Sequence, residues 1–199
     1  MIEVEKKFIL SDDDIKRLTE DAEFVSEKTF TDVYYDTADY ALTTKDQWLR
    51  RRGERFELKR PILHNGQRAA HTYEELETEN AIGAALNLVG GDSFAATLGT
   101  NGFHPFATII TTRRKYKAGD FTIDLDTADL GGYIHQIGEI ELMVSDVSQA
   151  QDAADRIITF AKSKDLKIAY VRGKLAEYIK RYKPDQYRLL VAAGVLKDL

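Results

Sequence analysis

Segments in which apolar and charged side chains alternate recur along this chain, and this alternation most constrains its fold. Successive side chains of a strand point to opposite faces of a sheet, so the pattern gives each strand one apolar and one charged face. The first segment places Val4 and Phe8 on one face. Its other face carries Glu3, Glu5 and Lys7. Taken alone, this segment indicates an ordinary half-buried strand whose charged side meets water.

The same two-sided pattern returns in nearly every later strand-like segment. The charged face carries both signs, and the opposite face carries aliphatic and aromatic residues. The charged positions after the first segment are Arg50, Arg52, Glu57, Lys59, Glu75, Glu77, Arg114, Asp124, Asp126, Glu139 and Glu141. Because the charged face recurs in nearly every expected strand, the architecture of the sheet must account for it.

Short turns join most of the expected strands. The strands are predicted at residues 3–10, 29–37, 48–52, 55–59, 71–77, 105–117, 121–127 and 134–144. Turns are expected at Gly53-Glu54, Asn65-Gly66, Gly119-Asp120 and Gly131-Gly132, and Pro61 is expected to end its strand. Parallel strands need long crossovers, so the sheet should be mainly antiparallel. About eight antiparallel strands are enough to close a barrel that holds one small ligand.

Helical patterns lie between and after these strands. Ser11 is expected to cap the first helix in a capping box with Asp14. Residues 37–45 suggest a short helical connection, and residues 79–102 a longer helix with Ile82, Leu86 and Val89 on one stripe and a stop at Gly90-Gly91. Further helices are predicted after Asp146, with an apolar stripe from residue 147 to 161, at residues 171–182, and in a short tail. The predicted class is α+β, with helices packed against the sheet.

Composition narrows the kind of protein. A length of 199 residues suits one domain or at most two, and a single domain is predicted to span 1–199. The net charge of -5 argues against a nucleic-acid binder. The chain has no cysteine, which excludes disulfides and thiolate metal sites. No apolar run is long enough for a membrane span, and charges occupy the place of a signal peptide. We expect a soluble, cytoplasmic monomer without membrane or nucleic-acid partners.

Two architectures fit the charged faces. In one, they are the wet outside of a sandwich or open sheet. In the other, they line the inside of a barrel, and the apolar faces meet helices outside. Charges inside cost several kcal/mol each unless they are compensated. A polyanion bound with divalent cations would compensate them, because arginine and lysine bind phosphate and paired carboxylates bind Mg²⁺. Lys174, on an apolar helical stripe, would also find a partner there.

Several short motifs resemble those of one family. Glu3-Val4-Glu5-Lys6-Lys7 has the E-x-E-x-K form of the triphosphate tunnel metalloenzymes, or CYTH superfamily. Further motifs follow in the family's order: Tyr34-Tyr35-Asp36-Thr37, Trp48-Leu49-Arg50-Arg51-Arg52, Glu57-Leu58-Lys59, residues 124–129 and Gly138-Glu139-Ile140-Glu141. Within the superfamily the chain is similar to the animal-type thiamine triphosphatases, notably in its Trp-Leu-Arg-Arg-Arg run and in Lys174-Leu175 through Tyr178 to Pro184.

The resemblance implies a fold, a reaction and a set of site residues. It implies an eight-stranded antiparallel closed barrel that hydrolyses thiamine triphosphate to thiamine diphosphate and phosphate with Mg²⁺, or Mn²⁺. The metal would be bound by Glu3, Glu5, Glu139 and Glu141, and Asp124, with Asp126 as a further candidate, would hold or orient a second metal or its waters. The substrate would contact Lys7, Arg50, Arg52, Lys59, Arg114, Lys174 and, as a stacking surface for its head group, Trp48. No general base is singled out; the candidates are Glu75, Asp124 and Asp126.

Alternative functions remain open at this stage. One is an inorganic triphosphatase or nucleotide-converting enzyme of the same tunnel, and another is a non-catalytic polyphosphate-binding module. The chain departs from the family pattern at Glu74 and Glu77 and in the run Arg113-Arg114-Lys115, which we expect on the outer face or rim. The four histidines show neither metal-ligand spacing nor a nucleophile partner and are expected to be surface or core residues.

Overall fold

The computed structural model describes residues 2–64 and 67–198, with side chains outside residues 63–72. Its strands are β1 (Ile2–Phe8), β2 (Glu23–Asp36), β3 (Trp48–Arg52), β4 (Arg55–His64), β5 (Gln67–Leu76), β6 (His104–Ala118), β7 (Phe121–Asp129) and β8 (Ile134–Val144). They form a closed antiparallel barrel in the order β1-β5-β4-β3-β2-β6-β7-β8. The predicted eight-stranded antiparallel barrel is therefore confirmed.

Six α-helices and two 3-10 turns accompany the strands in the described part of the chain. They are α1 (Asp12–Thr19), η1 (Thr43–Lys45), α2 (Glu79–Leu86), α3 (Phe94–Thr100), η2 (Val147–Gln149), α4 (Ala150–Ser163), α5 (Lys174–Tyr182) and α6 (Pro184–Ala192). No helix among the described residues is both long and apolar enough to cross a bilayer. The chain divides into two compact units: up to Phe30 with Pro61–Glu74 and Ile110–Lys174, and Thr31–Arg60 with Glu75–Ile109 and Leu175 onward. The predicted single domain stays a prediction.

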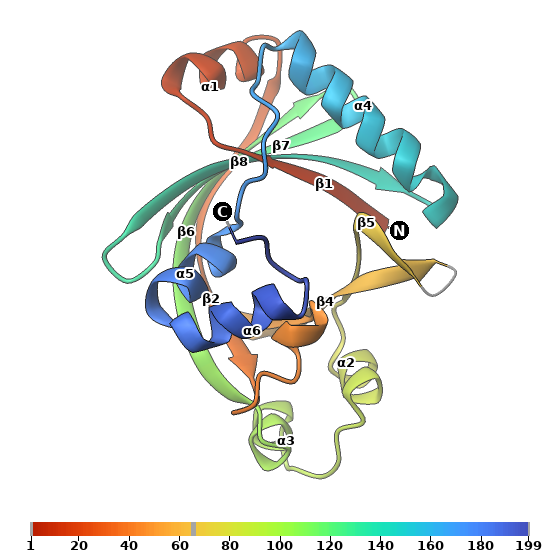
Figure 1. Cartoon of the computed structure of the whole chain (residues 1–199), viewed down its shortest axis with the longest axis vertical. Helices are drawn as coiled ribbons and strands as arrows, with labels where there is room; N and C mark the ends of the chain where they lie inside the picture. Colours follow the sequence, from red (N-terminus) through yellow and green to blue (C-terminus); the bar gives the residue numbers. More distant parts are fainter. Residues whose placement is uncertain (1, 65–66, 199) are drawn as a thin grey trace. The chain divides into compact units, whose positions relative to one another are not determined.

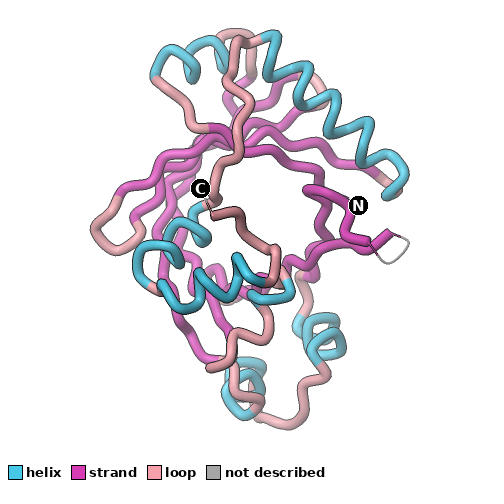
Figure 2. Tube along the Cα trace, viewed as in Figure 1, coloured by secondary structure: helices cyan, strands magenta, loops and turns pink. Residues whose placement is uncertain are grey.

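The first unit places β1 between β5 and β8, and β7 between β6 and β8. Its apolar core joins Val4 and Phe8 of β1 to the apolar faces of β7 and β8, and to Ile157 and neighbouring residues of α4. Figure 1 shows α4 running across these strands, and Figure 2 shows α4 and α1 as the helices on this face. The helices cover the apolar side of the sheet, and the charged side faces away from them.

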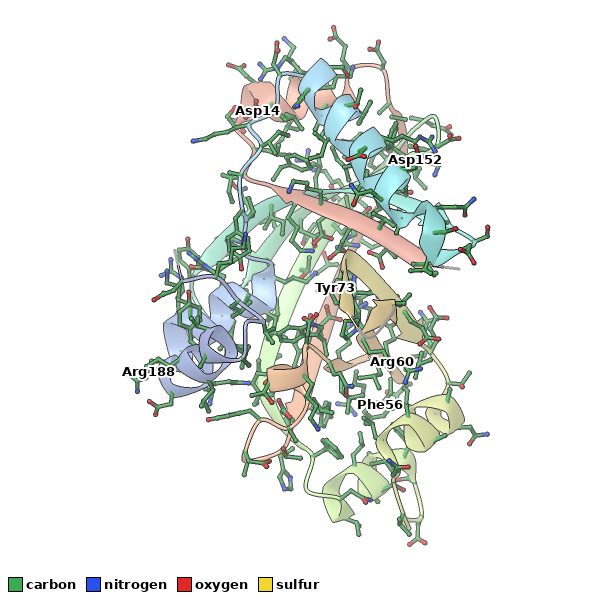
Figure 3. The ribbon with its side chains drawn as sticks, turned by 45° about the vertical axis from the view of Figure 1, so that its right-hand side comes forward. Asp14, Phe56, Arg60, Tyr73, Asp152 and Arg188 are labelled. Atoms are coloured by element: carbon green, nitrogen blue, oxygen red, sulfur yellow. The ribbon has the colours of Figure 1, made fainter. Side chains whose placement is uncertain are left out.

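The second unit repeats the same arrangement on a smaller scale. β3 lies between β2 and β4. Leu49, Phe56 and Leu58 of β3 and β4 pack against Ile82 of α2 and Leu98 of α3. Figure 3 labels Phe56 on the strand beside these helices. In both units, then, helices meet the apolar strand faces. Of the two architectures open to the sequence, the structure has the one with charges on the inner side of the barrel.

Several sequence-based boundaries need correction. Pro61 does not end its strand, since β4 continues to His64; the pairing of β4 with β3 stops at Lys59, so the missing N–H of Pro61 removes no bond to β3. The helix expected over residues 79–102 is two helices. The first ends at Leu86, its C-cap Asn87 adopts a left-handed conformation, and Val89 is exposed. The turn predicted at residues 65 and 66 lies outside the described residues.

Candidate metal and phosphate site

An acidic cluster forms where β1, β7 and β8 lie side by side in the first unit. Opposed residues of paired strands point to the same face. Glu5 is opposite Glu141, and Glu139 is opposite both Lys7 and Asp124. The members of this acidic cluster are Glu3, Glu5, Asp124, Asp126, Glu139 and Glu141. Asp124 is fully buried, and Asp126 and Glu139 are nearly so.

Two overlapping sets of carboxylates in this cluster could hold a cation. One set is Glu3, Glu5 and Glu141, and the other is Asp124, Glu139 and Glu141. In each set, one oxygen from each of the three carboxylates lies within 4.8 Å of the other two. Hard divalent cations such as Mg²⁺ prefer carboxylate oxygen ligands, so the donors present fit such an ion. Glu141 belongs to both sets.

Four basic side chains form ion pairs with members of the acidic cluster. Arg113 pairs with Asp124, with Asp126 (Nε to Oδ1, 2.6 Å) and with Glu139 (Nη2 to Oε2, 3.1 Å). Lys7 pairs with Glu5 and lies 3.3 Å from Glu139 Oε1. Lys115 contacts Asp124, and Lys174 Nζ lies 3.0 Å from Asp126 Oδ2. Charges of both signs therefore interleave on one face, as the sequence predicts.

Burial and neighbouring charges shift the pKa values of this cluster in different directions. Burial, reinforced by Asp124 and Glu139, raises the pKa of Glu141 to about 7. Burial would also raise the pKa of Asp126, but hydrogen bonds from Arg113 and the charge of Lys174 outweigh it and lower the pKa to about 2. Burial opposes the charge of Lys7, yet Glu5 and Glu139 raise its pKa well above the usual value.

A second group of charges lies on β2, β3, β4 and β5 in the second unit. Asp32 is fully buried and receives two hydrogen bonds from Arg52, at 2.7 and 2.9 Å. Arg50 Nε donates to Glu57 Oε2 at 2.7 Å. Lys59 Nζ lies 3.9 Å from Glu75 Oε1. We call Arg50, Arg52 and Lys59 the basic group; each of its members is held by a carboxylate on a strand of the same unit.

Two aromatic residues adjoin the basic group: Tyr34 lies opposite Arg50 in the pairing of β2 with β3, and Trp48 lies on β3 two residues before Arg50. Burial and the charge of Asp32 raise the pKa of the Tyr34 phenol to about 12, so this hydroxyl stays protonated at neutral pH. Trp48 is half-buried, and its indole Nε1 donates a hydrogen bond of 2.9 Å to Asp46 Oδ1. The bond fixes one edge of the indole ring.

The structure corrects the sequence reading of β6. Arg114 was expected at the phosphate site, but it lies opposite Leu125, whose side chain belongs to the apolar core under α4. Arg113 and Lys115 lie opposite Asp126 and Asp124 and take the inner face instead. The expectation of an outer or rim position is therefore wrong for Arg113 and Lys115.

The other residues singled out in the sequence lie in different environments. Lys174 is buried and pairs with Asp126, and its expected contact with phosphate stays a prediction. Glu77 is exposed as expected, whereas Glu74 is half-buried. Of the histidines, His104 is exposed and His135 is buried, and the side chains of His64 and His71 lie outside the described residues.

Comparison with known proteins places these features in a family. The model of the CYTH domain matches residues 1–168. The chain belongs to the CYTH family. Two curated CYTH relatives are the thiamine-triphosphatases of Homo sapiens and Macaca fascicularis, which are 32% and 31% identical over alignments that cover all of this chain and 93% of each relative. Among solved structures, the PH1819 protein from Pyrococcus horikoshii OT3 shares the fold, with a TM-score of 0.67, 21% identity, and coverage of 90% of this chain and 99% of that one.

Proposed function

We propose that this CYTH protein hydrolyses the terminal phosphoanhydride bond of thiamine triphosphate and releases thiamine diphosphate and phosphate. The observation that carries the proposal is the inner sheet face of the first unit, where carboxylates suited to a divalent cation alternate with Lys7, Arg113 and Lys174. The identity of 32% to a thiamine-triphosphatase over the whole chain supports the choice of substrate.

The acidic cluster would hold the metal. Its proposed ligands are drawn from Glu3, Glu5, Asp124, Glu139 and Glu141, with Mg²⁺ the expected ion and Mn²⁺ an alternative. When bound, a divalent ion would neutralise phosphate charge and lower the pKa of a coordinated water. The carboxylates would fix the place of the ion, and their own charges would be balanced by it and by the neighbouring cations.

The basic residues would position and neutralise the triphosphate. We propose this role for Lys7, Arg50, Arg52, Lys59 and Lys174, and for Arg113 in place of Arg114. Phosphoryl transfer depends mainly on positioning and on stabilising the charge that gathers on the transferred group. Side chains already held by carboxylates, such as Arg52 by Asp32, would lose little conformational freedom on meeting a phosphate.

Three carboxylates were candidates for the general base. Asp126, with a pKa of about 2 and partners in Arg113 and Lys174, would be a weak base. Asp124 is buried and contacts two cations. Glu75 has a looser pair, 3.9 Å from Lys59, and is half-buried. We therefore propose Glu75 as the first of the three to test, through a Glu75→Gln variant.

One set of assays tests the proposal. Purified protein is given thiamine triphosphate, tripolyphosphate or ATP, each with Mg²⁺, Mn²⁺ or a chelator, and phosphate release is measured. We expect metal-dependent hydrolysis that is fastest with thiamine triphosphate and is abolished by Glu5→Ala or Glu139→Ala. Binding of triphosphate without turnover would instead indicate a polyphosphate-binding module.

A substitution at Trp48 can distinguish a thiamine triphosphatase from an inorganic triphosphatase. The fixed edge of its indole makes it the proposed stacking surface for the thiamine head group. Trp48→Ala should then impair hydrolysis of thiamine triphosphate far more than hydrolysis of tripolyphosphate. Equal losses on both substrates would remove the stacking role and favour the inorganic substrate.

We also propose a cellular location and an oligomeric state for the chain. A cytoplasmic monomer that binds neither nucleic acid nor membrane agrees with the net charge of -5 and the lack of cysteine. Light scattering coupled to size-exclusion chromatography would test the monomer.

A further inference from the structure

The segment of residues 166–173 leads from α4 to α5 and forms neither helix nor strand. Figure 1 shows this segment, in blue, passing over β1. It is followed directly by Lys174, for which we propose contact with phosphate. A segment without its own regular hydrogen bonding is located by its contacts with the rest of the fold. The contacts of residues 172–174, which we call the strap, therefore decide where Lys174 lies.

Two successive strap residues meet the inner face of the sheet of the first unit through their backbone. The carbonyl oxygen of Arg172 lies 3.3 Å from Nε2 of His135 on β8. A Cβ atom on Gly173 would lie 3.0 Å from Cε of Lys7 on β1, which is closer than ordinary van der Waals contact. The strap backbone thus lies directly against the Lys7 side chain and is hydrogen-bonded to His135.

The third strap residue, Lys174, meets the same face through its charge. Its Nζ lies 3.0 Å from Oδ2 of Asp126, which also accepts hydrogen bonds of 2.6 and 2.7 Å from Arg113. In the proposed function the Lys174 ammonium turns toward a phosphate oxygen, so its pair with Asp126 weakens when its position matters most. The strap therefore needs an anchor that involves no group of the phosphate site.

His135 has the properties of such an anchor. It lies on β8 opposite Ala128 and faces the same side of the sheet as Glu139, four residues further along the strand. Its side chain is buried, and its ring stacks with that of Tyr133, with 6.5 Å between the ring centroids. A carbonyl oxygen only accepts, so the imidazole donates to the strap through Nε2.

We propose that His135 is a positioning residue. Through its hydrogen bond to the Arg172 carbonyl, it holds the strap on the sheet and keeps Lys174 where it would meet phosphate. This inference rests on the proposed function for the role of Lys174. It adds a residue that acts through the backbone two positions before that lysine and touches no substrate.

The first test measures how well Lys174 is protected in the absence of substrate. Full-length, metal-free protein is treated with acetic anhydride, and acetylation of each lysine is followed by mass spectrometry. His135→Leu removes the donor and keeps a side chain of similar size. It should raise the acetylation rate of Lys174 about fivefold, the change in an opening equilibrium expected from the loss of one hydrogen bond. Lys115, which lies within β6, is the internal reference and should keep its rate.

A pair of amide variants isolates the hydrogen bond from other effects of the substitution. His135→Gln keeps an N–H donor at a length similar to that of Nε2, and should leave Lys174 protected. His135→Asn carries the same amide on a side chain one methylene shorter, which is too short to reach the Arg172 carbonyl. It should behave like His135→Leu, and it replaces that variant if the leucine substitution prevents folding.

Gln136→Leu is the matched control for introducing a leucine on β8. Gln136 is exposed and faces the opposite side of the sheet from His135, so the variant should acetylate like the wild type. Urea unfolding would show that each variant is folded.

The second test asks whether His135 acts through Lys174. With thiamine triphosphate and Mg²⁺, His135→Leu should lower kcat/KM about fivefold, as expected for one hydrogen bond. In a Lys174→Met background the same substitution should have little further effect, because residues that act through one another are not additive.

Three results would overturn the inference. They are unchanged acetylation of Lys174 in both folded His135→Leu and folded His135→Asn, acetylation as fast in His135→Gln as in His135→Asn, and an equal loss of kcat/KM from His135→Leu with and without Lys174. Acetylation requires no turnover, so failure of the inference is distinguishable from failure of the proposed function. A chain that hydrolyses no triphosphate but protects Lys174 through His135 would refute the function and support the anchor.

Discussion

At the scale of single residues, strand alternation decides which charges meet. The acidic positions on β1, β7 and β8 were identifiable from sequence because each has at least one apolar neighbour, and Asp124 has two, Ile123 and Leu125. β6 offered no such contrast. Arg113, Arg114 and Lys115 are three consecutive cations, so a period of two cannot say which of them face inward. Only the register with β7 does.

The first prediction compares the neighbours Arg113 and Arg114. In metal-free protein, Arg113→Gln should lower the free energy of unfolding by about 3 kcal/mol, since it leaves buried Asp124 and Asp126 less well paired. Arg114→Gln should cost roughly 0.5 kcal/mol or less. Urea unfolding with a chelator present measures both. Similar costs for the two variants would mean that the register of β6 differs in solution.

At the scale of elements, the residues that cap the start of two helical segments were predictable from the sequence, whereas the end of α2 was not. Ser11 and Asp14 form the predicted capping box at the start of α1, and Asp146 caps the turn that leads into α4. The end of α2 was missed because Asn87 takes a left-handed conformation more typical of glycine. The sequence offered the later Gly90-Gly91 as the stronger stop signal.

The second prediction concerns the capping box. Ser11→Ala should lower the free energy of unfolding by about 1 kcal/mol at neutral pH. Hydrogen bonds from Ser11 lower the pKa of Asp14 in the folded state. The stability this shift supplies is present above the unfolded pKa and is lost as the pH falls through the folded pKa. The difference between wild type and variant, measured by thermal melts, should therefore shrink between pH 6 and pH 3; a constant difference would contradict it.

The third prediction tests how α4 covers the sheet. Ile157 is fully buried in the core of the first unit, and its neighbour Ile158 is only half-buried. Ile157→Ala should cost about 2–5 kcal/mol, because it removes buried methyl groups and leaves a cavity. Ile158→Ala, the same chemical change one residue later, should cost clearly less. Chemical denaturation measures both, and a reversed order would mean that α4 is rotated on the sheet.

At the scale of the whole molecule, the antiparallel barrel was predictable and its closure was less so. Short turns such as Gly119-Asp120 dictate that successive strands pair, which gives β6, β7 and β8 their order. β1 is the first strand along the chain and β8 is the last, so no turn or short connection in the sequence predicts that they pair. The family resemblance implied a closed barrel, but the pairing of β1 with β8 was not predicted.

The fourth prediction uses ligand linkage. A metal and a triphosphate that bind only the folded chain should stabilise it, by about 2.7 kcal/mol when the ligand is present at a hundred times its dissociation constant. Mg²⁺ with tripolyphosphate should therefore raise the melting temperature of the wild type, and Glu5→Gln should abolish the rise. Glu54→Gln, an exposed residue in the β3–β4 turn, is the control and should respond like the wild type. An unchanged response in Glu5→Gln would exclude Glu5 from the metal site.

The pairing of Glu5 with Glu141 also bears on how the chain is made. β1 leaves the ribosome before the other strands and β8 after them, so β1 must wait for that neighbour until all the other strands have emerged. Alternating charges help to keep a waiting strand edge from pairing with other chains. Glu3 and Glu5 can meet Glu141 only once β8 has emerged. The acidic cluster is thus among the last parts of the barrel to assemble, and binding of the proposed metal to a nascent chain would mark its completion.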